Sequence, residues 1–174
     1  MNKTGITGIR LTILGLVTLV TASCGVTNTQ RGVRGEPAPK EEKLDKRTRL
    51  KAREVEQRLL QAHRYWKGTP YRWGGDDRSG IDCSAFTLVV MKDVFNISLP
   101  RTTREQLRVG RKIRRGPFLP GDLLFFKTGK KTYHVGIVVN RNDFLHASTS
   151  KGVTIASYRT EYWRRRFIAA RRVL

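Results

Sequence analysis

The chain has 174 residues, with 35 Lys and Arg against 14 Asp and Glu, which gives a formal net charge of +21. This length suits one domain. Such a charge favours anionic partners, but the basic residues are dispersed and no nucleic-acid-binding motif accompanies them. We therefore expect no nucleic-acid partner. Anionic lipid, lipopolysaccharide and wall carboxylates are the favoured polyanions, and a simply solvated basic surface is the alternative.

The first 23 residues have the pattern of an export signal. Lys3 and Arg10 are followed by ten apolar residues at 11–20, and then by the small residues Thr21, Ala22 and Ser23. A transmembrane anchor is the alternative. Ten residues rise only about 15 Å as a helix, however, whereas a bilayer core is about 30 Å thick.

Cys24 follows this segment directly. The small-small-Cys ending resembles the lipobox of bacterial lipoproteins, although Thr21 stands where leucine is expected. The sequence thus predicts a lipoprotein signal peptide over 1–23, lipidation of Cys24 and a flexible Gly- and Pro-containing tether over 24–43. Gly25 after Cys24 favours an outer-membrane anchor that faces the periplasm. Ordinary cleavage nearby, which would release a soluble periplasmic protein, is the alternative.

The remaining residues, 44–174, read as one domain that starts with helices. The first helix has an apolar face of residues three and four positions apart, which ends before Gly68: Ala52, Val55, Leu59, Ala62 and Trp66. A second helix is predicted from Cys83 to Val94, with Asp82 or Ser79 as its cap. Thr102 and Glu105 form a capping box for a short third helix that ends at Gly110.

The second half of the domain changes to short apolar segments separated by turns. Strands are predicted at 122–126, 133–139, 144–148, 153–157 and 167–173. Helices followed by consecutive strands indicate an α+β fold, with helices packed on an antiparallel sheet of about five strands.

Cys83 is the candidate nucleophile. If Cys24 is lipidated, Cys83 is an unpaired thiol in an oxidising compartment, where such thiols are rare unless they have a function. Its place at a helix start predicts a lowered thiol pKa and N–H groups that can receive an oxyanion. An inert buried cysteine is the alternative.

His134 and His146 are the candidate partners of the thiol, on two strands joined by a short turn. A three-residue loop at 140–142 pairs residues whose numbers sum to 282 and places both rings on one sheet face, with Gly136 opposite His146. A two-residue loop at 141–142 would instead pair residues whose numbers sum to 283, and it would place the two histidine rings on opposite faces of the sheet. We predict the even register, with an asparagine of the loop in the left-handed region. His146 would then orient His134.

These residues lie in motifs that resemble the NlpC-type cell-wall peptidases, a papain-like family. The motifs span 68–174, the predicted catalytic core: GTPYRWGG, GIDCSAF, LPRTTREQ, PGDLLFF, YHVGIVV, FLHASTSKGV and the ending YWRRRFIAARRVL, which is similar to that of lipoprotein members. The resemblance implies Cys83 as nucleophile, His134 as proton acceptor and His146 as the residue that orients it. Tyr71 would help to bind the oxyanion.

The same resemblance assigns weaker roles to four neighbouring residues. Asp82 and Ser84 would contact polar groups of the substrate, or simply cap the helix. Trp73 would line the cleft or belong to the core. Ala85 stands where the family usually has glycine, and we expect its methyl group to narrow the cleft beside the thiol.

The implied activity is hydrolysis of peptide bonds in peptidoglycan stem peptides or cross-links, by a Cys-His-His triad and a thioester. Peptidoglycan peptides and the membrane, through Cys24, are the implied partners; no cofactor or metal is expected, and a monomer is the default. Three alternatives stay open. They are a zinc site of Cys83, His134 and His146, a non-catalytic wall-binding lipoprotein, and an amidase or acyltransferase of the same fold.

Overall fold

The computed structural model describes residues 45–114 and 117–174. The predicted signal peptide at 1–23, the lipidation site Cys24 and the tether at 24–43 lie outside these residues. Within the described ranges, no helix combines the length and apolarity needed to cross a bilayer.

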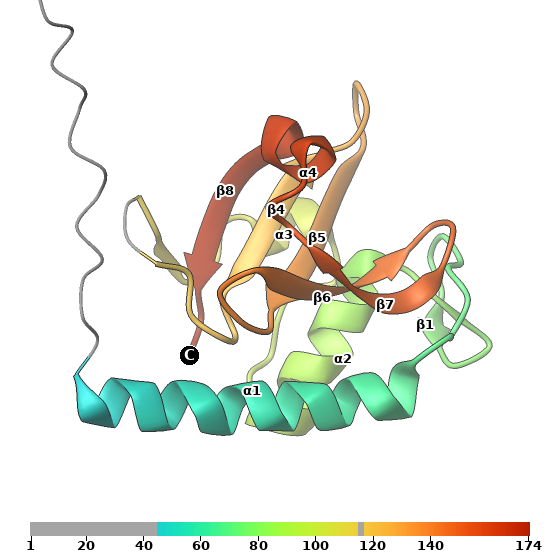
Figure 1. Ribbon diagram of the computed structural model, residues 1–174. Helices are drawn as coiled ribbons and strands as arrows, with labels where there is room; N and C mark the ends of the chain where they lie inside the picture. The colour runs from blue at the N-terminus through green and yellow to red at the C-terminus, as the bar shows by residue number, and fades with distance from the viewer. Residues whose placement is uncertain (1–44, 115–116) are drawn as a thin grey trace, which may run out of the picture. The chain divides into compact units, whose positions relative to one another are not determined.

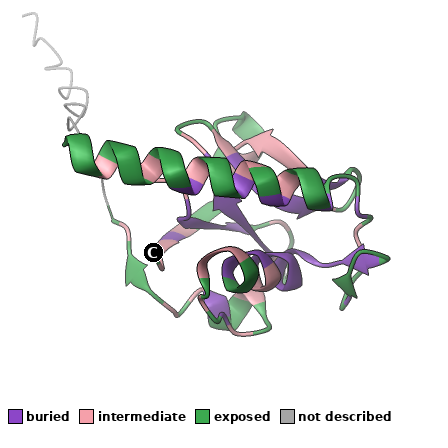
Figure 2. Cartoon of the chain, turned by 90° about the horizontal axis from the view of Figure 1, so that it is seen from below, coloured by how far each residue is buried: buried purple, intermediate pink, exposed green. Residues whose placement is uncertain are grey.

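Helix α1 (Lys46–Trp66) begins at Asp45, whose carboxylate accepts hydrogen bonds from the N–H groups of Arg47 and Thr48. It runs along the edge of the domain, with one buried stripe flanked by intermediate residues and an exposed outer face (Figure 2). The stripe contains four of the five residues of the predicted apolar face: Val55, Leu59, Ala62 and Trp66. Gly68, with φ at +80°, then turns the chain away as predicted.

Helices α2 (Cys83–Phe95) and α3 (Thr103–Gln106) begin at the predicted caps. Asp82 accepts from the N–H of Ala85, and Thr102 and Glu105 make a complete capping box. Helix α3 is shorter than predicted. The N–H groups of Arg108 and Val109 bond to carbonyls three residues back instead of four, so the helix tightens into a turn before Gly110.

All five predicted strands are present in one antiparallel sheet. They are β4 (Leu123–Lys127), β5 (Tyr133–Val138), β6 (Asp143–Ser148), β7 (Gly152–Ser157) and β8 (Phe167–Arg172). A sixth strand, β3 (Arg111–Lys112), makes the order β3-β8-β4-β5-β6-β7, and β1 (Asp76–Asp77) pairs with β2 (Gly80–Ile81) in a separate ribbon. The helix α4 (Glu161–Arg166) was not predicted, because six residues with three consecutive arginines show no apolar period.

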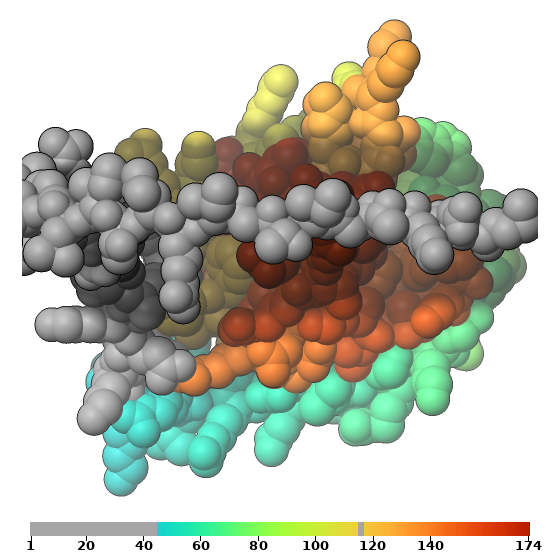
Figure 3. Space-filling view, turned by 45° about the horizontal axis from the view of Figure 1, so that its top comes forward, coloured from blue at the N-terminus to red at the C-terminus, as the bar shows by residue number. Residues whose placement is uncertain are grey.

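Both faces of the sheet are covered (Figure 1). Alternate residues of β4 and β5, such as Phe125 and Val135, pack with α1 and α2 in the main core. The residues between them, such as Phe126 and Val138, form a second cluster on the opposite face with Trp163 of α4. The C-terminal segment that contains α4 lies at the surface in the space-filling view (Figure 3). The fold is therefore α+β with an antiparallel sheet, as predicted.

Candidate active site

The hairpin of β5 and β6 has the predicted register. Ile137 pairs with Leu145 and Val138 with Phe144, so paired numbers sum to 282. The expected left-handed asparagine is absent from the turn, because Asn96 is the only non-glycine residue with positive φ in the described ranges. The side chain of Asn140 instead accepts hydrogen bonds from the N–H groups of Asn142 and Asp143, both at 2.9 Å, and reverses the chain as an Asx turn.

His134 and His146 meet on one face of this hairpin. Nε2 of His134 lies 2.9 Å from Nδ1 of His146, while the other ring nitrogen of His134 makes no hydrogen bond within the described residues. Gly136 lies opposite His146, as predicted. A Cβ at position 136 would lie 2.9 Å from Cβ of His146 and 2.5 Å from the ring of Phe144, so only glycine leaves room for this contact.

Both imidazoles are buried. Burial lowers the pKa of His134 to about 4. Burial, together with the charge that His134 would carry, lowers the pKa of His146 to about 3. Both rings are therefore neutral at pH 7, so one donates a proton to the other and each adopts a defined tautomer.

Aromatic rings enclose the two histidines. Phe144 stacks on His146 with ring centres 4.4 Å apart. Trp163 stacks on His134 with centres 5.3 Å apart and planes 27° apart, and meets His146 edge to face at 5.3 Å. These contacts hold the pair in a dry, apolar setting.

Cys83 is the first residue of α2 and is only 5% exposed. Its Sγ atom lies 3.7 Å from Oγ1 of Thr103, and the backbone N–H of Val135, the residue after His134, also bonds to the thiol. The thiol therefore lies beside β5, against the backbone of the residue that follows His134. No hydrogen bond joins Cys83 to the ring of His134 in the described part of the chain.

The expected lowering of the Cys83 pKa is wrong. Burial raises the pKa of the thiol, and this outweighs the lowering by hydrogen bonds from Thr103 and from the backbone of Val135. The helix start does supply N–H groups, but the main core around Cys83 makes its thiolate costly to solvate. The resting pair is thus a neutral thiol and a neutral imidazole.

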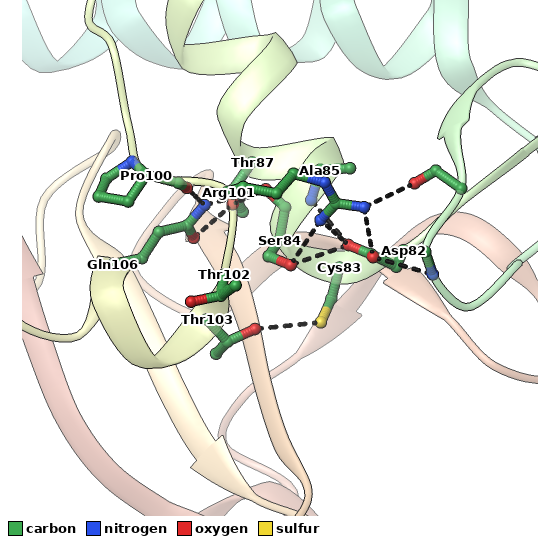
Figure 4. Close-up of polar contacts among 12 residues, drawn as sticks. Asp82, Cys83, Ser84, Ala85, Thr87, Pro100, Arg101, Thr102, Thr103 and Gln106 are labelled. Atoms are coloured by element: carbon green, nitrogen blue, oxygen red, sulfur yellow. Dashed lines mark hydrogen bonds and ion pairs between the residues drawn. The ribbon is translucent and has the colours of Figure 1, made fainter.

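Asp82, before the thiol, is held by Arg101 (Figure 4). Nη1 of Arg101 lies 3.0 Å from Oδ1 of Asp82, and Nη2 lies 2.7 Å from Oδ2. The carboxylate also accepts from the N–H groups of Gly74 and Ala85 and from the hydroxyl of Ser84. Burial alone would raise the pKa of Asp82, but these hydrogen bonds outweigh it and lower that pKa.

Asp82 and Ser84 therefore bind protein groups in this structure. The Ser84 hydroxyl donates to Asp82 and accepts from Arg101 at 3.1 Å, and Gln106 donates to the Ser84 carbonyl at 2.9 Å. These bonds fasten the loop before α3 to the start of α2. Asp82 caps α2, and substrate contact by either residue stays a prediction.

Tyr71 is half-buried and forms a bridge with Ile81, just before the thiol. Burial, with the negative charges that Cys83 and Asp82 can carry, raises the pKa of Tyr71 to about 12. Its hydroxyl is therefore a proton donor at neutral pH. Trp73 is 79% exposed, which excludes the core alternative for it.

Ala85 is 1% exposed and belongs to the main core. Cys83 belongs to the same core, so the expectation that the methyl group of Ala85 narrows the cleft stays a prediction.

The described residues contain no group of three His, Cys, Asp or Glu side chains arranged to hold a metal ion. Nε2 of His134 and Nδ1 of His146 face each other at hydrogen-bond distance, so these two nitrogens bond to each other.

Sequence reasoning missed three residues around the site: Arg101, Thr103 and Trp163. Arg101 and Thr103 lie in the LPRTTREQ motif, in which the sequence pattern indicated a role only for the capping residues Thr102 and Glu105. Trp163 lies in the C-terminal motif, and an unexplained tryptophan in a basic segment is the signal that was available.

The NlpC/P60 family model matches residues 68–172. A probable endopeptidase NlpC of Escherichia coli K12 is 51% identical over 110 residues, which are 62% of this chain and 71% of the relative. The murein DD-endopeptidase MepS/murein LD-carboxypeptidase of the same strain is 43% identical over 121 residues, 70% of this chain but only 64% of the relative.

The fold agrees with these sequence matches. A crystal structure of an NlpC/P60 family protein from Bacillus cereus ATCC 10987 superposes with a TM-score of 0.61 at 29% identity, over 67% of this chain and 39% of that one. The family match covers the thiol, both histidines and the strands that carry them. The chain therefore belongs to the NlpC/P60 family.

Proposed function

We propose that the protein is a cysteine endopeptidase that hydrolyses peptide bonds of peptidoglycan. The observation that carries the proposal is the hydrogen-bonded pair of His134 and His146, because the residue after His134, Val135, bonds through its backbone N–H to the thiol of Cys83. The relatives support the substrate class, because two of them are named as murein DD-endopeptidases and one as a probable peptidoglycan endopeptidase.

In the proposed mechanism Cys83 attacks the carbonyl carbon of the scissile bond. The thiol and the imidazole are both neutral at rest, so the proton moves from Sγ to Nδ1 of His134 as the S–C bond forms. For Nδ1 to accept, Nε2 of His134 must carry the proton and donate it to Nδ1 of His146. His146 thereby selects the tautomer of His134 that acts as a base.

The oxyanion would be stabilised by the backbone N–H of Cys83 at the start of α2 and by the hydroxyl of Tyr71. The raised pKa of Tyr71 keeps that hydroxyl protonated, as an oxyanion donor requires. His134 then returns the proton to the leaving amine, the amine departs, and a thioester remains on Cys83. Attack by water hydrolyses the thioester and frees the thiol.

We also propose that the protein is exported and held at a membrane. The export pattern over 1–23 supports this, and lipidation of Cys24 would anchor the domain through the tether at 24–43. Gly25 supports the outer membrane as its location. Mass spectrometry of the mature N-terminus should find Cys24 as the acylated first residue, and an unmodified Cys24 would contradict the anchor.

The test of the enzymatic function is digestion of purified muropeptides under reducing conditions, with products identified by mass spectrometry. Cross-linked dimers distinguish cleavage of the D-alanyl–diaminopimelate cross-link from cleavage between D-glutamate and diaminopimelate within a stem. We expect one of these bonds to be cut, since both are peptide bonds of the proposed substrate class. Intact muropeptides after incubation with folded wild-type protein would contradict the proposal.

A further inference from the structure

Helix α4 contributes one side chain to the histidine pair. Trp163 stacks on His134 and lies edge to face with His146, and it also contacts Phe126 and Phe144 within 5.0 Å between ring centres. No residue of α4 is fully buried, and its N-cap Thr160 makes no side-chain capping bond. Trp163 is therefore the main link between this short helix and the sheet.

The stacking of Trp163 on His134 restricts a rotation of the imidazole that the hydrogen bond to His146 still allows. The bond from Nε2 of His134 to His146 sets the direction of one nitrogen, but the imidazole can still turn about that axis. A flat indole face near-parallel to the ring fixes its plane as well. With both constraints, Nδ1 of His134 has one direction only.

Trp163 also keeps water away from the pair. His134 is 7% and His146 3% exposed, and both lie on the sheet face that α4 covers. The elements around His134 carry these charged and titratable groups: Cys83, Lys92 and Asp93 on α2, Arg104 and Glu105 on α3, Lys127 on β4, Tyr133 on β5, Asp143 and His146 on β6, and Glu161, Tyr162 and Arg164–Arg166 on α4. None of these causes the low pKa of His134, which burial alone produces.

We infer that Trp163 is a positioning residue for the reaction, which holds the plane of the His134 ring and excludes water from it. The inference rests on the proposed function, because it gives Trp163 the task of positioning His134, the base of the proposed reaction. A residue of this kind changes the rate of the chemical step more than the binding of the substrate. A tryptophan that only fills the core would change stability alone.

The test compares Trp163→Leu, which keeps apolar volume but removes the flat ring, with Trp163→Phe, which keeps a ring. Phe118→Leu is the matched control. Phe118 packs in the same cluster against Tyr158 and Phe167, but makes no ring contact with either histidine in the described residues. The unfolding midpoint of each variant is measured beside kcat and KM on cross-linked muropeptides.

We expect Trp163→Leu to lower kcat by roughly 100-fold with little change in KM. Trp163→Phe should restore most of kcat, and Phe118→Leu should lose stability while it keeps kcat. The inference is overturned if Trp163→Leu retains wild-type kcat, or if Phe118→Leu loses kcat to the same extent at an equal unfolding midpoint.

A second readout needs no substrate and separates this inference from the proposed function. NMR titration of the imidazole signals gives the pKa of His134, which should rise from about 4 toward 6.5 in Trp163→Leu and stay low in Phe118→Leu. An unchanged pKa in Trp163→Leu would contradict the role in excluding water, whether or not wild-type protein cleaves muropeptides. A wild-type protein without cleavage, but with the expected titration shift, would instead contradict the proposed function.

Discussion

Arg101 donates to both carboxylate oxygens of Asp82, with Nη1 3.0 Å from Oδ1 and Nη2 2.7 Å from Oδ2. This paired geometry suits a guanidinium and cannot be reproduced by the single ammonium of lysine. Because Asp82 is also the N-cap of α2, the contact joins the loop before α3 to the residue that precedes the thiol.

The first prediction concerns this contact. Arg101→Lys keeps the charge but loses the paired bonds, so we expect unfolding to require about 1–3 kcal/mol less free energy, together with slower muropeptide cleavage. Urea denaturation and initial rates check this. Arg53→Lys, on the exposed face of α1, is the control and should leave both unchanged. If Arg101→Lys kept the stability and cleavage rate of the control variant, Asp82 would not need arginine as its partner at the start of α2.

The second prediction concerns Gly136. In Gly136→Ala the new methyl group would lie 2.9 Å from Cβ of His146 and 2.9 Å from the carbonyl oxygen of Leu145. Strand β6 must move away to relieve these contacts, and this movement separates the two histidines. We expect loss of most activity and about 1–3 kcal/mol of stability from overpacking. Gly129→Ala is the matched control, since its nearest neighbour is the flexible side chain of Thr132 at 3.2 Å. Full activity in Gly136→Ala would mean that the His134–His146 contact is dispensable.

The third prediction concerns the pH dependence of stability. The pKa values of about 4 for His134 and 3 for His146 lie below the unfolded value of 6.5, so the unfolded state binds more protons as the pH falls. Stability should therefore drop from pH 6.5 toward pH 4, by about 1 kcal/mol per pH unit for each histidine.

Denaturant unfolding of His146→Asn measures this effect. The variant removes one of the two buried titrating rings, so its stability should fall less steeply between pH 6.5 and pH 4 than that of the wild type. His63→Asn removes a partly exposed histidine of α1 and should keep most of the wild-type slope. Equal slopes in wild type and His146→Asn would contradict the burial of a neutral pair.

Local signals in the sequence predicted most of the fold. The capping residues Asp82 and Thr102 marked the starts of α2 and α3, and alternating or continuous apolar segments marked all five long strands. The register that brings His134 and His146 together was also predicted, although the left-handed asparagine from which it was argued is absent from the turn in the described residues. These features depend on neighbours in the chain, which is why a single sequence contains them.

The remaining features depend on contacts between distant segments. The raised pKa of Cys83 follows from the core that closes over α2, and no local pattern indicates how deep a helix start will lie. The stacking of Trp163 on His134 requires α4 to cross the sheet face, and a six-residue helix has too little period to predict. Strand β3, with two residues, was missed for the same reason.

Cys83 is the proposed nucleophile, and the two cysteines of the chain allow a matched test of this role. Cross-linked muropeptide dimers are incubated with wild type, Cys83→Ala and Cys24→Ala under reducing conditions, and cleavage is followed by liquid chromatography and mass spectrometry. Wild type and Cys24→Ala should convert the dimers to smaller products at similar rates, and Cys83→Ala should leave them intact while it remains folded. Cleavage by Cys83→Ala at the wild-type rate would contradict the assignment of Cys83 as the nucleophile.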